Sequence, residues 1–251
     1  MAINQSEQTA RTATASPLGR IRKPIARIRR IHPWLYQSRP ALNGQRFRQE
    51  MFRSLLQELQ PDAVFESGTY RGATTQFLWH VSGRPVYTVE KDPALARLVA
   101  RRFRDVAEIR VMKSDSRKAL QGLRENSSFP KSRVFFYLDA HWEEDLPLRE
   151  EVAIITGGWT DSLILIDDFK VPDDPGYGFD TYAGTQLSVE YLGNAVGEYK
   201  VFWPNCPSSE ETGARRGCVL LAAPTLADRM AALDPVRSMD DAVPLGRAGS
   251  R

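Results

Sequence analysis

Acidic residues recur at the ends of the strands that the sequence predicts. Four of the five main predicted strands end in, or shortly precede, an acid, and another acid follows the remaining strand. These acids are Glu66, Glu90, Asp115, Asp139, Asp167 and Asp168. The carboxyl ends of the strands in an open α/β sheet form one edge, where ligands bind. Because crowded carboxylates cost stability unless cations offset their charge, this edge is predicted to bind positively charged groups.

A glycine turn follows the first of these acids. It runs through Glu66-Ser67-Gly68-Thr69-Tyr70-Arg71-Gly72 and opens a predicted helix. Gly68 and Gly72 allow a tight turn and close backbone approach, and free N–H groups at a helix start can hold an anionic group. The segment is either a cofactor loop or an ordinary strand-to-helix turn, since short glycine motifs often match by chance.

The position of Glu90 indicates a nucleoside cofactor. It lies 24 residues after Glu66, near the spacing at which an acid accepts hydrogen bonds from ribose hydroxyls. A nicotinamide enzyme is expected to show G-x-G-x-x-G after the first strand. Here Gly68 and Gly72 are four apart and an acid precedes them, so a pyrophosphate group would meet a carboxylate.

Strand and helix patterns alternate along the chain. Apolar residues from Gln45 to Leu59 recur on one helix face. Strands are predicted at 62–66, 86–90, 108–113, 133–139 and 162–168, alternating with helices at 72–81, after 92, near 116–124 and near 147–156. A helix near 184–194 and strands at 199–203 and 217–222 follow. This order predicts a Rossmann-like α/β fold with a doubly wound, mostly parallel sheet in a three-layer αβα sandwich. The last two strands are expected to form an antiparallel pair.

Composition and charge narrow the class of protein. The chain has 251 residues, 42% of them hydrophobic, and only two cysteines, which is typical of one globular core in a reducing compartment. Residues 1–49 carry ten Lys or Arg against one Glu, so the net charge of +3 divides into +9 there and −6 in the remainder. An acidic body argues against nucleic-acid binding, which requires a basic face.

Three regions are expected. Residues 1–44 form a basic, largely disordered leader, 45–223 form the folded domain, and 224–251 form a tail. Residues 20–31 alternate Ile with Arg or Lys and either contact an anionic membrane or polyanion or form a solvated arm. The composition favours the arm. We expect a cytoplasmic protein, with a peripheral position at the inner membrane face if the leader binds lipid.

The acids and the glycine turn together resemble the class I S-adenosylmethionine-dependent methyltransferases. The resemblance covers about residues 45–222, with two glycines in the turn where many members have three. It implies that Glu66, Gly68, Thr69 and Gly72 hold the methionine end of S-adenosylmethionine. It also implies that Glu90 binds the ribose and that Asp115 lies near the adenine amine.

Two further stretches resemble the metal-binding strands of catechol O-methyltransferase and of macrocin-type sugar O-methyltransferases. They are Leu138-Asp139-Ala140-His141-Trp142 and Leu165-Ile166-Asp167-Asp168-Phe169. The resemblance implies that Asp139, Asp167 and Asp168 bind Mg²⁺ or a similar divalent cation, which takes oxygen ligands. Alternatively, the last two acids cap the following turn. His141 is the candidate general base, because its ordinary pKa suits removal of a hydroxyl proton.

The resulting prediction is an S-adenosylmethionine-dependent O-methyltransferase, assisted by a divalent metal, that acts on a small-molecule or sugar hydroxyl. The loop at 172–182 is either a lid over the acceptor or a plain surface loop. The expected partners are the acceptor, an anionic membrane surface and a second copy of the chain, with no nucleic acid. The rivals are a metal-dependent hydroxylase or nicotinamide oxidoreductase on the same fold, and a non-catalytic binding module recruited by the basic arm.

Overall fold

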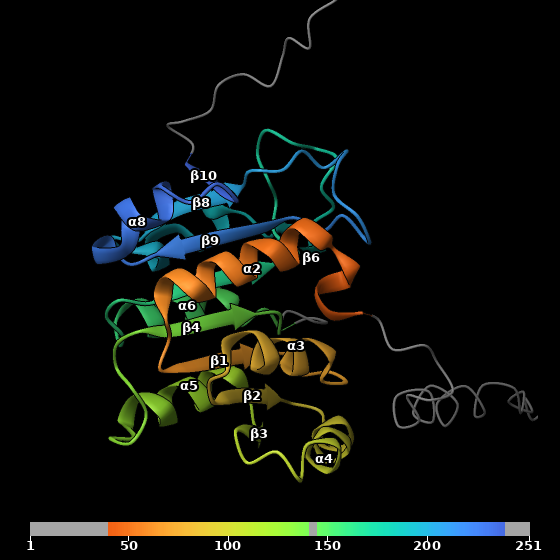
Figure 1. Cartoon of the computed structure of the whole chain (residues 1–251), viewed down its shortest axis with the longest axis vertical. Coiled ribbons are helices and arrows are strands. Elements are labelled where there is room, and N and C mark those ends of the chain that lie inside the picture. The colour runs from red at the N-terminus through yellow and green to blue at the C-terminus, as the bar shows by residue number, and fades with distance from the viewer. Residues whose placement is uncertain (1–39, 141–144, 239–251) are drawn as a thin grey trace, which may run out of the picture. The chain divides into compact units, whose positions relative to one another are not determined.

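The computed structural model describes residues 40–140 and 145–238 and contains one eight-stranded sheet. The strands lie in the order β10-β8-β9-β5-β4-β1-β2-β3, and Figure 1 labels all of them except β5. Five neighbouring strands are parallel: β1 (Ala63–Ser67), β2 (Val86–Glu90), β3 (Ile109–Lys113), β4 (Val134–Leu138) and β5 (Leu163–Asp167). The strand β9 (Cys218–Ala222) runs antiparallel to both β5 and β8 (Lys200–Pro204), which confirms the predicted antiparallel pair.

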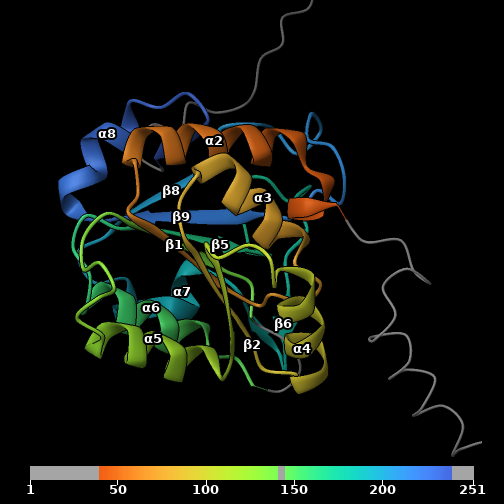
Figure 2. The same cartoon turned by 60° about the horizontal axis from the view of Figure 1, so that its bottom comes forward.

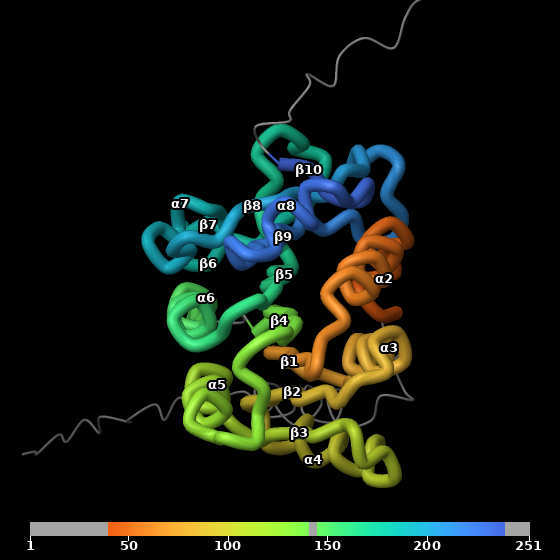
Figure 3. Tube along the Cα trace, turned by 60° about the vertical axis from the view of Figure 1, so that its left-hand side comes forward, coloured from red at the N-terminus to blue at the C-terminus, as the bar shows by residue number. Residues whose placement is uncertain are grey.

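Helices cover both faces of the sheet. On one side lie α2 (Arg46–Leu59) and α3 (Ala73–Ser82), with α4 (Pro93–Arg102) beside β2 and β3. On the other side lie α5 (Ser116–Glu125), α6 (Leu148–Thr156) and the short α7 (Val189–Leu192), as Figures 2 and 3 show. The arrangement confirms the predicted three-layer αβα sandwich.

The central strands form the core because they are buried on both faces. Every residue of β1, β4 and β5 is buried, as expected for parallel strands between two helical layers. The helix α2 contributes Phe52, whose ring lies 5.4 Å from that of Phe135 and 5.5 Å from that of Tyr137. This packing fixes α2 over β4.

The beginning of α2 is capped by a segment distant in sequence. The side chain of its N-cap residue, Gln45, accepts no hydrogen bond from the N–H groups of the helix. Instead, the buried carboxylate of Glu211 accepts from the backbone N–H groups of Phe47 at 3.1 Å and Arg48 at 3.0 Å, and Thr212 accepts from that of Arg46 at 2.8 Å. These contacts satisfy N–H groups that a helix start leaves without partners.

The structure differs from the predicted helix near 184–194. That range begins in a hairpin of β6 (Thr181–Tyr182) and β7 (Thr185–Gln186), and α7 covers only Val189–Leu192. The reason is the turn at Ala183 and Gly184, whose φ angles are +48° and +83°, the geometry that joins two strands through a tight hairpin turn. The short helix η4 (Gly193–Val196) follows α7.

Further elements lie outside the range 45–223. They are η3 (Ala41–Gly44), η5 (Pro224–Leu226), α8 (Ala227–Ala231) and β10 (Val236–Ser238). Leu42 of η3 is 1% exposed, and β10 pairs antiparallel with β8. In residues 40–140 and 145–238, no helix is long and apolar enough to cross a membrane.

Candidate functional site

The carboxyl ends of β1, β2, β4 and β5 lie at the same edge of the sheet. Their parallel register pairs Ser67 with both Val89 and Leu138, and pairs Leu138 with Ile166. The edge therefore carries Glu66, Glu90, Asp139, Asp167 and Asp168. Burial, followed by the charges of Asp167, Asp168 and Glu66, raises the pKa of Asp139 well above its ordinary value. The acids are thus close enough to influence one another.

Glu66 is buried beneath this edge. Its side chain is 0% exposed, and its Oε2 accepts hydrogen bonds from the hydroxyls of Thr75 and Thr88, the latter at 2.7 Å. Its Oε1 has no hydrogen-bond partner in the described part of the chain, and neither has the buried Oγ of Ser67. Burial raises the pKa of Glu66 to about 7, although the two threonine hydroxyls lower it and the charge of Glu90 raises it slightly.

The glycine turn is shaped by contacts within the protein. A Cβ atom on Gly68, where φ is +85°, would lie 2.2 Å from the carbonyl oxygen of Asp139. A Cβ atom on Gly72, where φ is +75°, would lie 2.7 Å from the ring of Phe103. Both glycines are therefore required for close packing in the left-handed region. The hydroxyl of Thr69 lies 2.5 Å from that of Thr88 and is buried, so it lies in a hydrogen-bonded chain leading to Glu66.

Glu90 and Tyr70 form the exposed side of this turn. The carboxylate of Glu90 accepts from the backbone N–H of Tyr70 at 2.8 Å and from that of Asp92 at 2.9 Å. Burial raises its pKa, although these N–H groups lower it. Each carboxylate oxygen has two acceptor positions, so Glu90 keeps capacity for hydroxyl donors. Among the residues that the structure describes, Tyr70 is the one exposed large hydrophobic side chain, at 47%.

Asp115 lies at the same edge, just after β3, but its carboxylate is already engaged. It caps α5 through the N–H of Arg117, and it accepts from the Arg117 guanidinium at 3.0 and 2.8 Å. The hydrogen bonds from Arg117 lower the pKa of Asp115. Arg117 also binds Asp145 at 2.9 Å, and Lys91 binds Asp145 at 2.8 Å. An ion-pair network therefore joins the loops after β2, β3 and β4.

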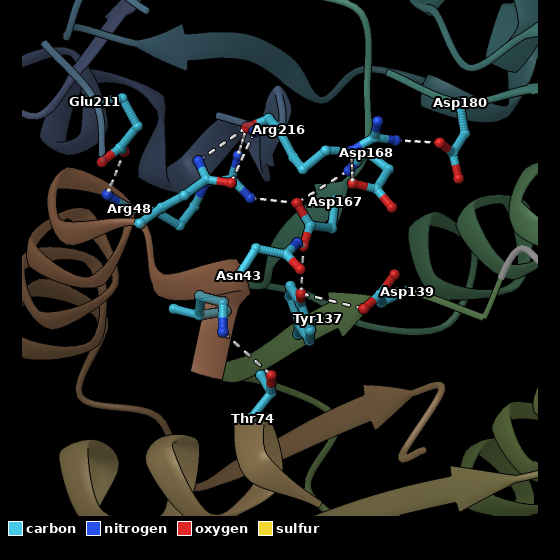
Figure 4. Close-up of polar contacts among 12 residues, drawn as sticks. Asn43, Arg48, Thr74, Tyr137, Asp139, Asp167, Asp168, Asp180, Glu211 and Arg216 are labelled. Carbon is cyan, nitrogen blue, oxygen red and sulfur yellow. Dashed lines mark hydrogen bonds and ion pairs between the residues drawn. The ribbon is translucent and has the colours of Figure 1, made fainter. Parts of the chain in front are cut away.

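Each of the three acids predicted to bind a metal contacts side-chain donors of the protein, and the Tyr137 hydroxyl contacts both Asp139 and Asp167 (Figure 4). Asp167 is fully buried and pairs with the guanidinium of Arg48, whereas Asp168 pairs with Arg216 at 2.5 Å. Asp139 receives a long hydrogen bond of 3.4 Å from the Tyr137 hydroxyl. Outside residues 1–39, 141–144 and 239–251, no three His, Cys, Asp or Glu side chains are grouped so that they could hold a metal ion. As they stand, these acids do not fit a metal site.

Four residues that contact the acids were not predicted from the sequence: Arg48, Arg216, Tyr137 and Asn43. Arg48 had a detectable signal, because it lies four residues before Phe52 and seven before Leu55 on the buried face of α2. A charged residue in an apolar stripe requires a buried partner. Arg216 and Asn43 gave no comparable signal, since their contacts to the edge span long stretches of chain.

Two further predictions concern loops at the edge. His141, the predicted base, lies outside the described residues, so its role stays a prediction. The loop at 172–182 is held in place: Asp174 accepts from the backbone N–H of Ser208 at 2.7 Å and from its hydroxyl at 2.6 Å. The hydroxyl of the buried Tyr177 donates to the carbonyl of Cys206 at 2.9 Å. These hydrogen bonds tie the loop to the segment that contains Cys206 and Ser208.

Comparisons with known proteins agree on the architecture. The sequence matches no protein-family model and no curated protein. The fold is similar to that of an O-methyltransferase from Bacillus cereus, solved in complex with S-adenosylhomocysteine, with TM-score 0.51 and 14% identity over 84% of this chain and 92% of that one. It is also similar to the O-methyltransferase TomG from Streptomyces achromogenes, solved with S-adenosylmethionine, with TM-score 0.50 and 16% identity over 70% of this chain and 79% of that one. The chain therefore has the Rossmann-like fold of these O-methyltransferases, which confirms the fold predicted from its sequence.

Proposed function

We propose that the protein is an S-adenosylmethionine-dependent O-methyltransferase that acts on a hydroxyl of a small-molecule or sugar acceptor. The observation that carries the proposal is the acidic edge around Glu66. There, a fully buried carboxylate has one oxygen without a partner in the described residues, and the buried hydroxyl of Ser67, the next residue of β1, has none there either. Such atoms cost stability unless a ligand satisfies them. An acidic edge suits a cofactor that carries two cationic groups, an α-ammonium and a sulfonium.

The residues of this edge have distinct roles in the proposal. Glu66 supplies negative charge beneath the glycine turn, and Glu90 would accept hydrogen bonds from the ribose hydroxyls through its remaining acceptor positions. Asp115 would accept a hydrogen bond from the adenine amine only if its carboxylate bound the amine and Arg117 at the same time. When bound, the cofactor would supply an electrophilic methyl group to the acceptor oxygen and would leave as S-adenosylhomocysteine. The acceptor hydroxyl would have to lose its proton, and His141 is the proposed base.

The divalent cation predicted from the sequence has no step in this proposal. Asp167 and Asp168 are paired with arginines, so no part of the reaction is assigned to a metal on them. Contact with an anionic membrane, a second copy of the chain and a cytoplasmic location remain proposals. Co-sedimentation of full-length and leader-truncated protein with anionic vesicles tests the membrane contact, and equal partitioning of the two would exclude it.

Calorimetric titration of S-adenosylmethionine tests the function. We expect saturable binding by wild type, weakened about 10- to 100-fold in Glu90→Gln because hydrogen bonds to a charged group contribute ~1.5–3 kcal/mol. Glu108→Gln is the matched control, because Glu108 is exposed and lies just before β3, at the opposite edge.

A labelled methyl donor with a panel of sugars, phenols and lipid-linked glycans then identifies the acceptor. Binding of a nicotinamide cofactor in place of S-adenosylmethionine would favour the oxidoreductase, and binding of neither would favour the non-catalytic module.

A further inference from the structure

Asp167, the last residue of β5, forms a buried ion pair with Arg48 of α2. The side chains of both residues are 1% exposed, and an Nη1 N–H of Arg48 donates to Asp167 Oδ1. The Nη2 of the same guanidinium donates to the carbonyl oxygen of Arg216. A buried charge needs both a partner and hydrogen bonds, and Arg48 has both. Figure 4 shows this guanidinium between Asp167 and the Arg216 backbone.

The remaining acceptor positions of Asp167 are also used. The hydroxyl of Tyr137 donates to Oδ2 at 2.7 Å, and the amide of Asn43 donates to the same oxygen at 3.4 Å. The backbone N–H of Asp168 donates to Oδ1 at 2.9 Å. A carboxylate has about four acceptor positions. All of those on Asp167 are thus directed at protein donors.

Arg216 neutralises the neighbouring acid in the same way. Its Nε donates to Asp168 at 2.5 Å, and its Nη2 donates to Asp180. Its backbone is fixed by Gln45, which accepts from the Arg216 N–H at 2.8 Å and donates to the Arg216 carbonyl at 2.9 Å. The next residue, Gly217, has no room for a side chain, because a Cβ atom would lie 2.2 Å from the carbonyl oxygen of Phe169. The position of Arg216 is therefore set by packing and hydrogen bonds.

A divalent ion would require a different arrangement of these acids. Mg²⁺ needs oxygen ligands converging at about 2.0–2.1 Å in near-octahedral geometry. Arg48 holds Oδ1 of Asp167, so a metal bound to Oδ2 would displace the donors Tyr137 and Asn43 from that oxygen. It would also lie beside a buried guanidinium that already offsets the charge of Asp167, and a cation is unfavourable next to a buried cation. The two guanidiniums already supply the positive charge that the acids need.

We propose that Arg48 and Arg216 occupy the place of the divalent ion, and that this edge works without a metal. Asp167 and Asp168 then act as positioning residues. They hold the two guanidiniums, and through them α2 and the segment around Arg216, beside the cofactor edge. The inference rests on the proposed function, because a positioning role at this edge requires that an acceptor binds there for methyl transfer.

The first test is calorimetric titration of MgCl₂ and of MnCl₂ into metal-free wild type, without and with S-adenosylmethionine. We expect no saturable binding of either ion and the same affinity for S-adenosylmethionine in EDTA as in Mg²⁺. Saturable binding at one ion per chain that disappears in Asp167→Asn would overturn the proposal. If S-adenosylmethionine itself does not bind, the proposed function fails, whereas the metal titration without it still decides this inference.

A double-mutant cycle provides the second test. Arg48→Met and Asp167→Asn should each lower Tm, and the double variant should have a higher Tm than Asp167→Asn alone, because the unpaired guanidinium is removed. Replacing EDTA with Mg²⁺ should raise neither the Tm of wild type nor that of Asp167→Asn. The exposed pair Arg229 and Glu58 is the control and should show little coupling. Purely additive effects of Arg48→Met and Asp167→Asn would contradict the proposal, and the wild-type titration remains decisive if a variant does not fold.

Discussion

Replacing Glu66 with glutamine should stabilise the cofactor-free protein at alkaline pH and weaken its binding of S-adenosylmethionine. The substitution keeps the size of the side chain and an oxygen that can accept from Thr75 and Thr88, but it removes the buried charge. An ionised carboxylate is unfavourable at a position that is 0% exposed and has one oxygen without a partner in the described residues. The charge is therefore expected to serve binding at the expense of stability.

The pKa sets the size and direction of the effect. Burial raises the pKa of Glu66 from 4.5 to about 7 in the folded protein. The unfolded chain releases the Glu66 proton at lower pH than the folded protein does. The folded state therefore has its full stability from protonated Glu66 below pH 4.5, and it loses this stability as the pH rises through about 7. At ~1.36 kcal/mol per pKa unit, the ionised residue destabilises the folded state by ~3 kcal/mol above this window.

Urea unfolding of wild type and Glu66→Gln at a series of pH values from about 5 to about 8 measures this effect. Between about pH 5 and about pH 8, the free energy of unfolding of the variant should rise by ~2–3 kcal/mol relative to that of wild type. The control Glu108→Gln should follow wild type, because Glu108 is exposed. Parallel curves for wild type and Glu66→Gln would refute the reasoning, because they would show that Glu66 titrates as it does in water.

The same residue gives a signature in binding. A cation that binds beside Glu66 favours its ionised form, so wild type should release a proton on binding S-adenosylmethionine at about pH 6. Calorimetry in two buffers of different ionisation enthalpy measures that proton. Glu66→Gln should bind S-adenosylmethionine more weakly than wild type and should release fewer protons per bound molecule. Equal proton release from both proteins would show that the proton comes from another group.

Two further predictions follow from the geometry of the described residues, and a third from the sequence. Gly72→Ala should lower the free energy of unfolding by ~1–3 kcal/mol in urea, because its φ is +75° and a Cβ would meet the ring of Phe103; an unchanged midpoint would contradict this packing role. Asp174→Ala should speed limited proteolysis between residues 172 and 182, because the loop loses its hydrogen bonds to Ser208. If the variant is cleaved at the wild-type rate, other contacts hold the loop in place. His141→Gln should lower kcat by ~10²–10⁴-fold with little change in the affinity for S-adenosylmethionine, and an unchanged kcat would exclude this residue as the base.

The alternation of strands and helices made most of the fold predictable. Short apolar runs ending at Glu66, Glu90 and Asp139 indicated parallel strands, because short continuous apolar runs bracketed by turn residues are typical of buried strands. The same logic placed the acids at one edge. The hairpin at Ala183 and Gly184 was missed because both residues need positive φ, and the sequence showed only one glycine there.

The partners of the acids were not predictable in the same way. Asp167 and Asp168 looked like metal ligands because neighbouring carboxylates at a strand end are what a divalent ion uses. Their arginine partners come from the beginning of α2, 119 residues earlier than Asp167, and from a position 48 residues after Asp168. Charge pairing over such distances depends on tertiary packing, which local patterns do not encode.

The most direct test of the central claim is a crystal structure of the protein with S-adenosylhomocysteine. The account predicts that the ribose hydroxyls lie within hydrogen-bonding distance of the Glu90 carboxylate. It also predicts that the amino-acid end lies beside Glu66 and the turn at Gly68. Cofactor bound at another face of the sheet, or none at saturating concentration, would contradict the claim that this acidic edge is the methyl-donor site.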